Sequence, residues 1–246
     1  MLKIDINCDM GEGIGNDEAI MPWISSVNIA CGYHAGDENI MRTTIELALK
    51  NNVAIGAHPS FFDKENFGRI EMNLSETEIY DLVLLQVRTI DRIVKRKKAK
   101  LHHVKPHGAL YNMSAKDQHV ARAIGQAVKD FDDTLILFGL SGSYSVIEAK
   151  KMGLKAAHEA FADRTYQDDG SLTSRSTRYA LIEDVDKSVT QALQIAKEKT
   201  VTSLDGKKIP IEVETICIHG DGKNAIELAR RISQIMRQND IQIKAL

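Results

Sequence analysis

The sequence predicts an α/β fold of alternating parallel strands and helices, and three observations support this. Seven short β-rich runs alternate with longer segments whose apolar residues recur at helical spacing, as in a sheet covered by helices. The chain has 246 residues, close to the roughly 250 typical of a (β/α) barrel. Histidines, acids and a lysine gather where the short runs end, and in a barrel the loops after the strands open on one face. We therefore predict an enzyme with a single domain, residues 1–246, folded as a TIM-barrel-like (β/α)7 barrel, regular or distorted.

The position of each element follows from periodicity. β-Branched and apolar runs bounded by polar or glycine-rich segments predict strands at residues 2–7, 26–31, 53–57, 101–105, 134–140, 155–158 and 212–219. Apolar residues at helical spacing predict helices at residues 37–50, 75–95, 116–129, 143–151, 183–199 and 223–238. Periodicity alone does not decide whether the strands close into a barrel, but the chain length and the spread of polar strand ends favour closure.

Two local signals refine this arrangement. The helix at 75–95 opens on Ser-Glu-Thr-Glu, a capping box in which the Ser75 and Glu78 side chains bond each other's free backbone amides. Asp205-Gly206 separates two short runs and predicts a small antiparallel hairpin before the last strand.

Composition limits the class of function. A hydrophobic content of 43% can fill a sizeable core, and a formal net charge of -2 offers no broad attraction to nucleic acid or an anionic membrane. The start of the chain has no basic leader or apolar signal core, so we expect a cytoplasmic protein with a small-molecule ligand. Cys8, Cys31 and Cys217 share no CxxC spacing, and buried packing is the expected role of each thiol.

Polar side chains alternate along the first strand. Asp5, Asn7 and Asp9 have one parity and their apolar neighbours the other, so the polar set should point to one side of the strand. Carboxylates on the inward face of a barrel need a cation, a metal or a substrate as partner. The alternative is a solvated edge strand.

The second unit ends in NIACGYHAGD, residues 28–37. Asn28 lies in the strand, and the two glycines of the loop allow a ligand to approach the backbone closely. His34 lies between those glycines and is a candidate for contact with substrate or metal. Asp37 fits either a binding role or the cap of the next helix.

The third unit ends in GAHPS, residues 56–60, followed by a long loop. Gly56 and His58 share parity, so the residue without a side chain is expected to leave room beneath the His58 imidazole. Arg69, in the later segment NFGR, is a candidate anion clamp, with ordinary surface charge as the alternative.

The fourth unit carries the strongest local signal, KPHGALYN at residues 105–112. Lys105 and His107 share parity and Tyr111 follows, which places an ammonium, an imidazole and a phenol after one strand. Lysine is rarely buried without a partner, so a merely structural role is the weaker alternative. Lys105 would stabilise an oxyanion or bind a carboxylate, and His107 would transfer protons.

Acids and bases also follow the last two strands. The segment HEAFADRTY offers Glu159 as a general base, with Asp163 and Arg164 as its positioning pair, against the alternative of a surface ion-pair loop. The last strand ends in IHGD, with His219 in the pocket and Asp221 either in the pocket or capping the next helix.

The succession of INCDMGEGIG, NIACGYHAGD, IGAHPSF, FGR, HVKPHGALYN, EAFADRTY and IHGD resembles the family of 5-oxoprolinase A subunits, also called LamB/YcsF, along nearly the whole chain. The resemblance implies a deacetylase-like barrel. It also implies a part in the ATP-dependent opening of 5-oxo-L-proline to L-glutamate, with the B and C subunits of 5-oxoprolinase as partners. Because the chain has no GxxxxGK[ST] phosphate loop, we expect ATP, the co-substrate, to be bound largely by a partner.

This reaction needs a base, a cation and a proton donor. The expected catalytic residues are Asp9 or Glu159 as base, Lys105 as cation, and His58, His107 and His219 for proton transfer. The expected substrate-binding residues are Asp5, Asn7, Asn28, His34, Arg69, Tyr111, Asp163, Arg164 and Asp221. The sequence does not decide whether a divalent metal ion is bound.

Two other functions remain open at this point. An aspartate-rich first strand with several histidines also suits a metal-dependent carbohydrate deacetylase that activates water on a zinc-type ion. The chain could instead be a non-catalytic subunit that binds the ligand without turnover.

Overall fold

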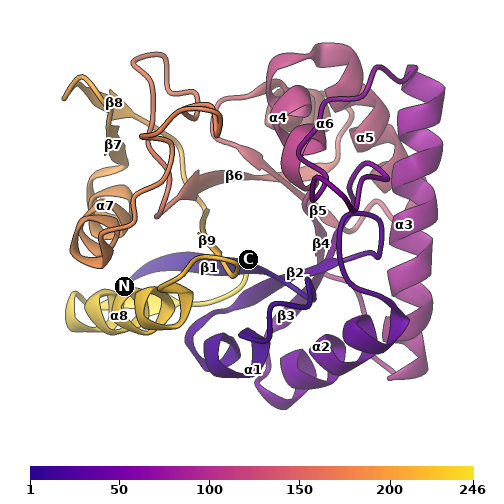
Figure 1. The fold of residues 1–246 in the computed structure, drawn as a ribbon, viewed down its shortest axis with the longest axis horizontal. Helices are drawn as coiled ribbons and strands as arrows, with labels where there is room; N and C mark the ends of the chain where they lie inside the picture. The colour runs from indigo at the N-terminus through magenta and orange to yellow at the C-terminus, as the bar shows by residue number, and fades with distance from the viewer.

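Seven parallel strands close into a barrel in the computed structural model, which describes residues 1–246 (Figure 1). Each strand pairs with the next along the chain, and the last closes the sheet because it pairs with both β6 and β1. Closure confirms the predicted fold class. The barrel strands are β1 (Leu2–Met10), β2 (Ser26–Ala30), β3 (Ala54–His58), β4 (His103–Val104), β5 (Ile136–Leu140), β6 (Lys155–Phe161) and β9 (Thr215–His219).

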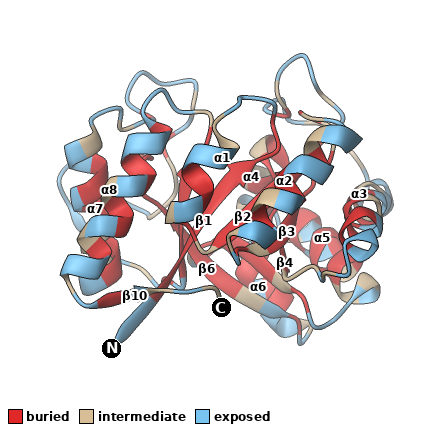
Figure 2. Ribbon diagram, turned by 90° about the horizontal axis from the view of Figure 1, so that it is seen from below, coloured by how far each residue is buried: buried red, intermediate tan, exposed pale blue.

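Helices surround the barrel and bury one face each. Figure 2 shows the barrel strands buried apart from the start of β1, while the helices are buried toward the barrel and exposed on their outer side. The capping box of α3 is present, and Asp37 caps α2 by accepting from the Asn39 and Ile40 amides. The helices are α1 (Asp17–Ile20), α2 (Glu38–Lys50), α3 (Glu76–Arg96), α4 (Gly108–Lys116), α5 (Gln118–Phe131), α6 (Tyr144–Lys151), α7 (Val185–Glu198) and α8 (Ala225–Gln238), with a 3-10 turn at Met21–Trp23.

Several elements differ from the predicted ones. β1 extends to Met10 and β6 to Phe161, so both reach further toward the mouth of the barrel than expected. The hairpin is confirmed as β7 (Thr200–Thr202) and β8 (Lys208–Pro210). Helix α4 and strand β10 (Ile241–Ile243), which pairs with the first residues of β1, were not predicted.

One cluster of 57 buried hydrophobic residues fills the space between the barrel and the helices. None of the helices is both long enough and apolar enough to span a bilayer.

Gly56 leaves room for a different imidazole from the predicted one. A Cβ at this position would lie 2.1 Å from Nε2 of His103 on the neighbouring strand, so the expected space beneath His58 is occupied by His103. His103 Nε2 is hydrogen-bonded to the Asn28 side-chain oxygen at 2.8 Å, which holds the ring in place.

Gly56→Ala should therefore lower the free energy of unfolding by about 1–3 kcal/mol, because the added methyl group forces a fully buried ring to move. Urea denaturation measures the change. Gly222→Ala is the matched control, since its Cβ would meet only an ordinary contact at 3.6 Å. Equal stability of the two variants would contradict this account of Gly56.

Candidate active site

The inward face of β1 carries a column of polar side chains along the barrel axis. Asp5, Asn7 and Asp9 are all buried, and the Thr215 hydroxyl joins two of them by accepting from Asn7 and donating to Asp5. The Asn7 amide donates to Glu159 at 2.9 Å, and the Asn28 amide donates to both Asn7 and Asp9. Neighbouring strands thus hold this column in a fixed orientation.

Asp5 lies at the opposite end of the column from the mouth. Its carboxylate accepts hydrogen bonds from the hydroxyls of Ser25, Ser26 and Thr215 at 2.6–2.7 Å. These internal partners give Asp5 a structural environment, and the structure does not bring it to the cavity that Asp9 lines.

Lys105 is the cation of the barrel interior, with only 2% of its surface exposed. Its Nζ lies 2.9 Å from Asp9 Oδ1 and 3.0 Å from Glu159 Oε1. Burial by itself lowers the pKa of Lys105, but the charges of Asp9 and Glu159 outweigh it and hold that pKa well above its ordinary value. Lys105 is therefore a permanent ammonium.

Asp9 is the carboxylate that balances this ammonium near the mouth. Burial raises the pKa of Asp9, but the neighbouring His58 and Lys105 outweigh burial and hold it well below the ordinary range. Asp9 lines the central cavity, whereas Glu159 is fully buried below it. Of the two expected bases, Asp9 is the one in reach of a ligand.

Glu159 and Tyr111 have unused polar atoms in the barrel. Glu159 Oε2 and the Tyr111 hydroxyl are buried without a hydrogen bond of normal geometry. Burial, followed by the Glu159 charge, raises the pKa of Tyr111 well above its ordinary value, so the phenol keeps its proton. A neutral phenol at the cavity is a hydrogen-bond donor.

Three histidines and an acid gather beside Asp9. His107 Nδ1 lies 3.0 Å from His58 Nε2, and the His34 ring stacks on His107 with centroids 3.8 Å apart. Burial lowers the pKa of His34 to about 2, and burial also lowers the pKa of His107. The structure thus brings together all three of these sequence candidates.

Glu12 completes this cluster and was not among the expected site residues. Its Oε1 lies 3.4 Å from His34 Nε2 and 3.7 Å from His107 Nδ1. Burial and the Asp9 charge raise the pKa of Glu12 well above its ordinary value. The available signal was an acid between two glycines just after the polar strand, in the segment DMGEG.

The predicted pairing of Glu159 with Asp163 and Arg164 is wrong. Asp163 accepts from His219 Nδ1 at 2.9 Å and from the His219 backbone amide at 3.1 Å. Arg164 donates to the carbonyls of Ala180 and Thr173. Glu159 points into the barrel and Asp163 lies at its mouth, so the two acids face different partners.

The rim of the mouth carries an ion pair that the sequence did not predict. Arg69, the candidate anion clamp, donates to Asp221 at 2.7 Å, and both side chains are partly exposed. Asp221 is not the cap of α8, because that position is taken by Asn224. An anion at Arg69 would have to compete with the Asp221 carboxylate.

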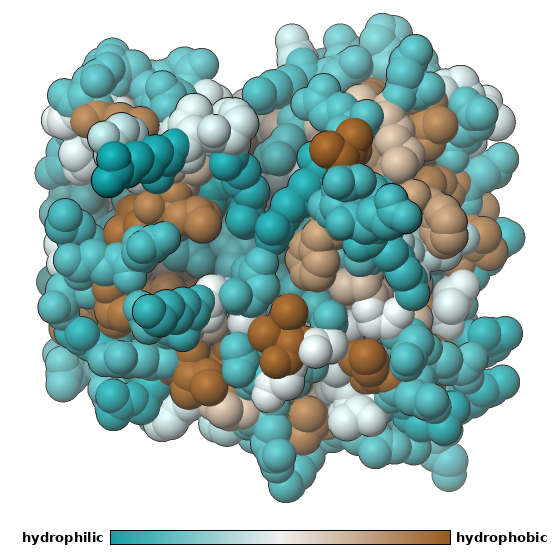
Figure 3. Space-filling model, in the orientation of Figure 1, coloured by the Kyte–Doolittle hydropathy of each residue, from teal (hydrophilic) through white to brown (hydrophobic).

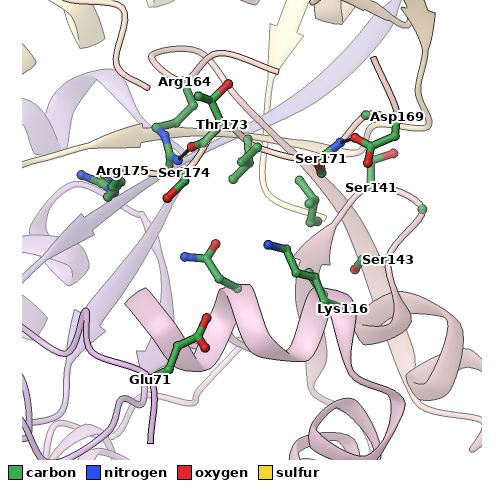
Figure 4. A pocket seen from close by; sticks show the side chains of 16 residues that line it. Glu71, Lys116, Ser141, Ser143, Arg164, Asp169, Ser171, Thr173, Ser174 and Arg175 are labelled. Atoms are coloured by element: carbon green, nitrogen blue, oxygen red, sulfur yellow. Dashed lines mark hydrogen bonds between the residues drawn. The ribbon is translucent and has the colours of Figure 1, made fainter. Parts of the chain in front are cut away.

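A basic cavity adjoins the central one. The central cavity is lined by Asp9, His58, Lys105, His107 and His219, and it shares Arg164 and Arg175 with a neighbouring space of about 250 Å³. Figure 4 shows Arg164, Arg175 and Lys116 around this space, with Ser141 and Ser143 on one side and Glu71 and Asp169 at its edges. Figure 3 shows a hollow with a mostly hydrophilic surface over the middle of the same molecule.

Arg164 gives this cavity its electrostatic character. It is 4% exposed and bonds carbonyl oxygens rather than a carboxylate. Burial, followed by the charge of Arg175, lowers the pKa of Arg164 to about 10. A buried cation with a like charge beside it favours binding of an anion.

The cysteines are buried free thiols, as expected. Cys217 is also close to the Lys105 ammonium, with Sγ and Nζ 2.9 Å apart. Two groups of side chains in the mouth have the composition and proximity to hold a metal ion: Glu12, His34, His58 and His107, and Asp9, Cys217 and His219.

Known proteins resemble this chain over its full length. Residues 4–246 match the model of the LamB/YcsF family. A protein of Bacillus cereus (strain AH820), named as the A subunit of 5-oxoprolinase, is 48% identical over 251 residues, covering 100% of this chain and 99% of its own. A protein of the same name from Bacillus cereus (strain ATCC 14579) is 49% identical, with the same coverage.

Solved structures are also similar to this chain. The lactam utilization protein of Thermus thermophilus superposes with a TM-score of 0.93 at 40% identity, covering 100% of both chains. A family 4 carbohydrate esterase of Streptomyces lividans superposes with a TM-score of 0.53 at 8% identity, covering 98% of this chain and 91% of that one, which shows a shared deacetylase-like barrel and no more. From the family match and these identities, the chain belongs to the LamB/YcsF family.

Proposed function

We propose that this chain acts in the hydrolytic opening of 5-oxo-L-proline to L-glutamate, coupled to ATP hydrolysis, as the A component of a 5-oxoprolinase with partner B and C subunits. The observation that carries the proposal is the buried Lys105 beside Asp9, next to a cavity with two arginines. The names of the 5-oxoprolinase and lactam utilization relatives support the substrate class.

The residues suit the chemistry of a stabilised cyclic amide. In the first step, the lactam oxygen attacks the γ-phosphorus of ATP and ADP leaves. Water then adds to the ring carbon and the C–N bond breaks, which leaves an acyl phosphate; a second water releases phosphate and L-glutamate. The first water becomes the carbonyl oxygen of the acyl phosphate and loses both protons, while the ring nitrogen gains one as it leaves; the second water is deprotonated as it attacks.

Specific side chains would perform these transfers. Asp9 lines the cavity as an ionised carboxylate and would accept a proton from water. Lys105 would stabilise negative charge on the oxygen that the first water adds to the ring carbon. His219, held by Asp163, would protonate the leaving nitrogen.

The arginines would bind the negative groups of the reactants. Arg164 and Arg175 line both cavities, so the substrate carboxylate and a transferred phosphate would lie side by side between them. The rest of the nucleotide would be bound by a partner protein, and we expect no ATP hydrolysis by this chain alone.

Glutamate release from 5-oxo-L-proline and ATP, measured with the B and C subunits, should occur only when this chain is present. Arg175→Gln should raise KM for 5-oxo-L-proline at least about tenfold, because one charged hydrogen bond to the carboxylate is worth roughly 1.5–3 kcal/mol. Arg230→Gln on the exposed side of α8 is the matched control and should leave KM unchanged.

Two other outcomes would replace this proposal. Glutamate release without the chain, together with acetate release from an acetylated sugar by the chain, would favour a carbohydrate deacetylase. Tight binding of 5-oxo-L-proline with no turnover in the presence of both partners would make the chain a ligand-binding subunit.

A further inference from the structure

We infer a binding site for one divalent transition-metal ion at the mouth of the barrel, formed by His58 and His107 with the carboxylates of Asp9 and Glu12. The inference rests on the orientation of the two imidazoles and is independent of the reaction proposed above.

Backbone carbonyls fix the orientation of both rings. His58 Nδ1 lies 2.7 Å from the Lys105 carbonyl oxygen, so this nitrogen carries the proton and donates it. His107 Nε2 lies 2.9 Å from the Phe67 carbonyl oxygen and donates in the same way. In each neutral ring the other nitrogen therefore has a lone pair.

These two lone pairs face each other. His58 Nε2 and His107 Nδ1 are 3.0 Å apart in a buried site. Two acceptors at that distance repel unless a cation lies between them, and the cation is either a proton or a metal ion. A metal-ligating histidine commonly donates its second ring N–H to a carbonyl or carboxylate, as both rings do here.

The surrounding acids favour a metal ion over a proton. Asp9 Oδ2 lies 3.5 Å from His58 Nε2, and Glu12 Oε1 lies 3.7 Å from His107 Nδ1. A shared proton would satisfy the two nitrogens and supply one positive charge beside the two acids, whereas a divalent ion supplies two and can bind the carboxylate oxygens directly. Glu12, His58 and His107 hold ligand atoms within 4.8 Å of one another, and Oδ2 of Asp9 is free to join them because Lys105 and Asn28 occupy only its Oδ1 atom.

The loop backbone is built tightly around this site. Gly68 has a φ of +64°, and a Cβ there would lie 2.2 Å from Ser60 Oγ and 3.1 Å from the His107 ring. A Cβ on Gly108 would lie 2.4 Å from the Gly68 carbonyl oxygen. The two glycines thus allow the Phe67 carbonyl to reach His107, and they fix the ring before any ligand arrives.

Two neighbouring side chains have other roles. The His34 ring is parallel to His107, with an interplanar angle of 4°, so it forms a wall of the site. The second group, Asp9 with Cys217 and His219, is less suited to a cation because Cys217 Sγ is 2.9 Å from the Lys105 ammonium.

Two imidazoles with two carboxylates suit Mn²⁺, Fe²⁺, Co²⁺ or Zn²⁺. When bound, such an ion would activate water or polarise an oxygen of the substrate.

Co²⁺ titration of the metal-depleted full-length chain tests the inference, with visible ligand-field absorption and bound metal per chain as readouts. We expect one ion per chain. Glu12→Gln should lower Co²⁺ affinity at least about tenfold and His107→Ala more, in proteins whose circular dichroism matches the wild type. His119→Ala, on the exposed surface of α5, and Cys217→Ser should both bind as the wild type does.

Three results would overturn the site. The first is absence of a bound ion in the wild-type chain. The second is Co²⁺ affinity that is unchanged in Glu12→Gln and in His107→Ala. The third is a ¹⁵N imidazole spectrum in which His58 and His107 share one proton that added metal does not displace.

Discussion

Replacing Lys105 by methionine should lower turnover at least about 10²–10³-fold and the free energy of unfolding by about 3–5 kcal/mol at neutral pH. The side chain stays long and unbranched but loses the terminal ammonium that faces Asp9 and Glu159 in the barrel interior. Removal of one partner of a buried ion pair leaves the other charge desolvated and unpaired, which costs more than the pair itself contributes.

The stability loss should depend on pH in a defined direction. The pKa of Asp9 is depressed in the folded chain, so its contribution to stability is present above the ordinary value of 3.8 and is lost as pH falls through the folded value. Without Lys105 this depression shrinks. The difference in the free energy of unfolding between the wild type and Lys105→Met should therefore be largest near neutral pH and become smaller as the pH falls below about 4.

Urea denaturation at neutral and acidic pH measures both quantities, with circular dichroism as the check on folding. Lys155→Met, at the exposed start of β6, is the matched control and should change neither turnover nor stability. A Lys105→Met chain as stable and as active as the wild type would show that the buried ammonium is not the centre of the site.

The sequence predicted those parts of the site that depend on strand parity. Asp5, Asn7 and Asp9 share one face because successive side chains of a strand alternate, and Lys105 meets Asp9 because parallel strands end on one face. Strand alternation and the common face at which parallel strands end hold for any parallel barrel, whatever its loops. The closed barrel was favoured by the chain length and the spread of polar strand ends rather than by the alternation of strands and helices.

Positions set by loop backbone were not predictable in this way. Glu12 reaches the histidines because Gly11 and Gly13 have φ values of +72° and +81° and fold the loop back over the mouth. The pairing of Asp163 with His219 joins two strand ends far apart in the sequence. These two residues are neighbours only because β6 and β9 pair side by side in the barrel.

The missed elements have a similar explanation. Helix α4 begins directly at Gly108, which has a φ of +56°, and its nine residues are too short for a clear apolar period. Strand β10 has three residues and exists only because the start of β1 offers it an unpaired edge. Both are formed by tertiary contacts rather than by local propensity.

Asp163→Asn should lower kcat by about 10²–10⁴-fold while KM for 5-oxo-L-proline stays within a factor of about two, by analogy with other buried Asp–His pairs. The Asp163 carboxylate accepts from His219 Nδ1 at 2.9 Å, which leaves Nε2 as the ring atom available for proton transfer at the cavity. An amide at this position can donate to Nδ1, which would favour the other tautomer and move the proton to Nε2.

Steady-state kinetics of glutamate release with the B and C subunits separates this positioning role from a structural one. A structural role would lower stability and raise KM, whereas the loss of proton transfer lowers kcat alone. Asp163→Glu keeps the acceptor and should restore part of kcat, and Asp205→Asn in the exposed hairpin turn is the matched control. Full kcat in Asp163→Asn would contradict this role of Asp163. Proton transfer would then have to pass to His58 or His107. Their lone pairs face each other at 3.0 Å and, on the inference above, bind a metal ion.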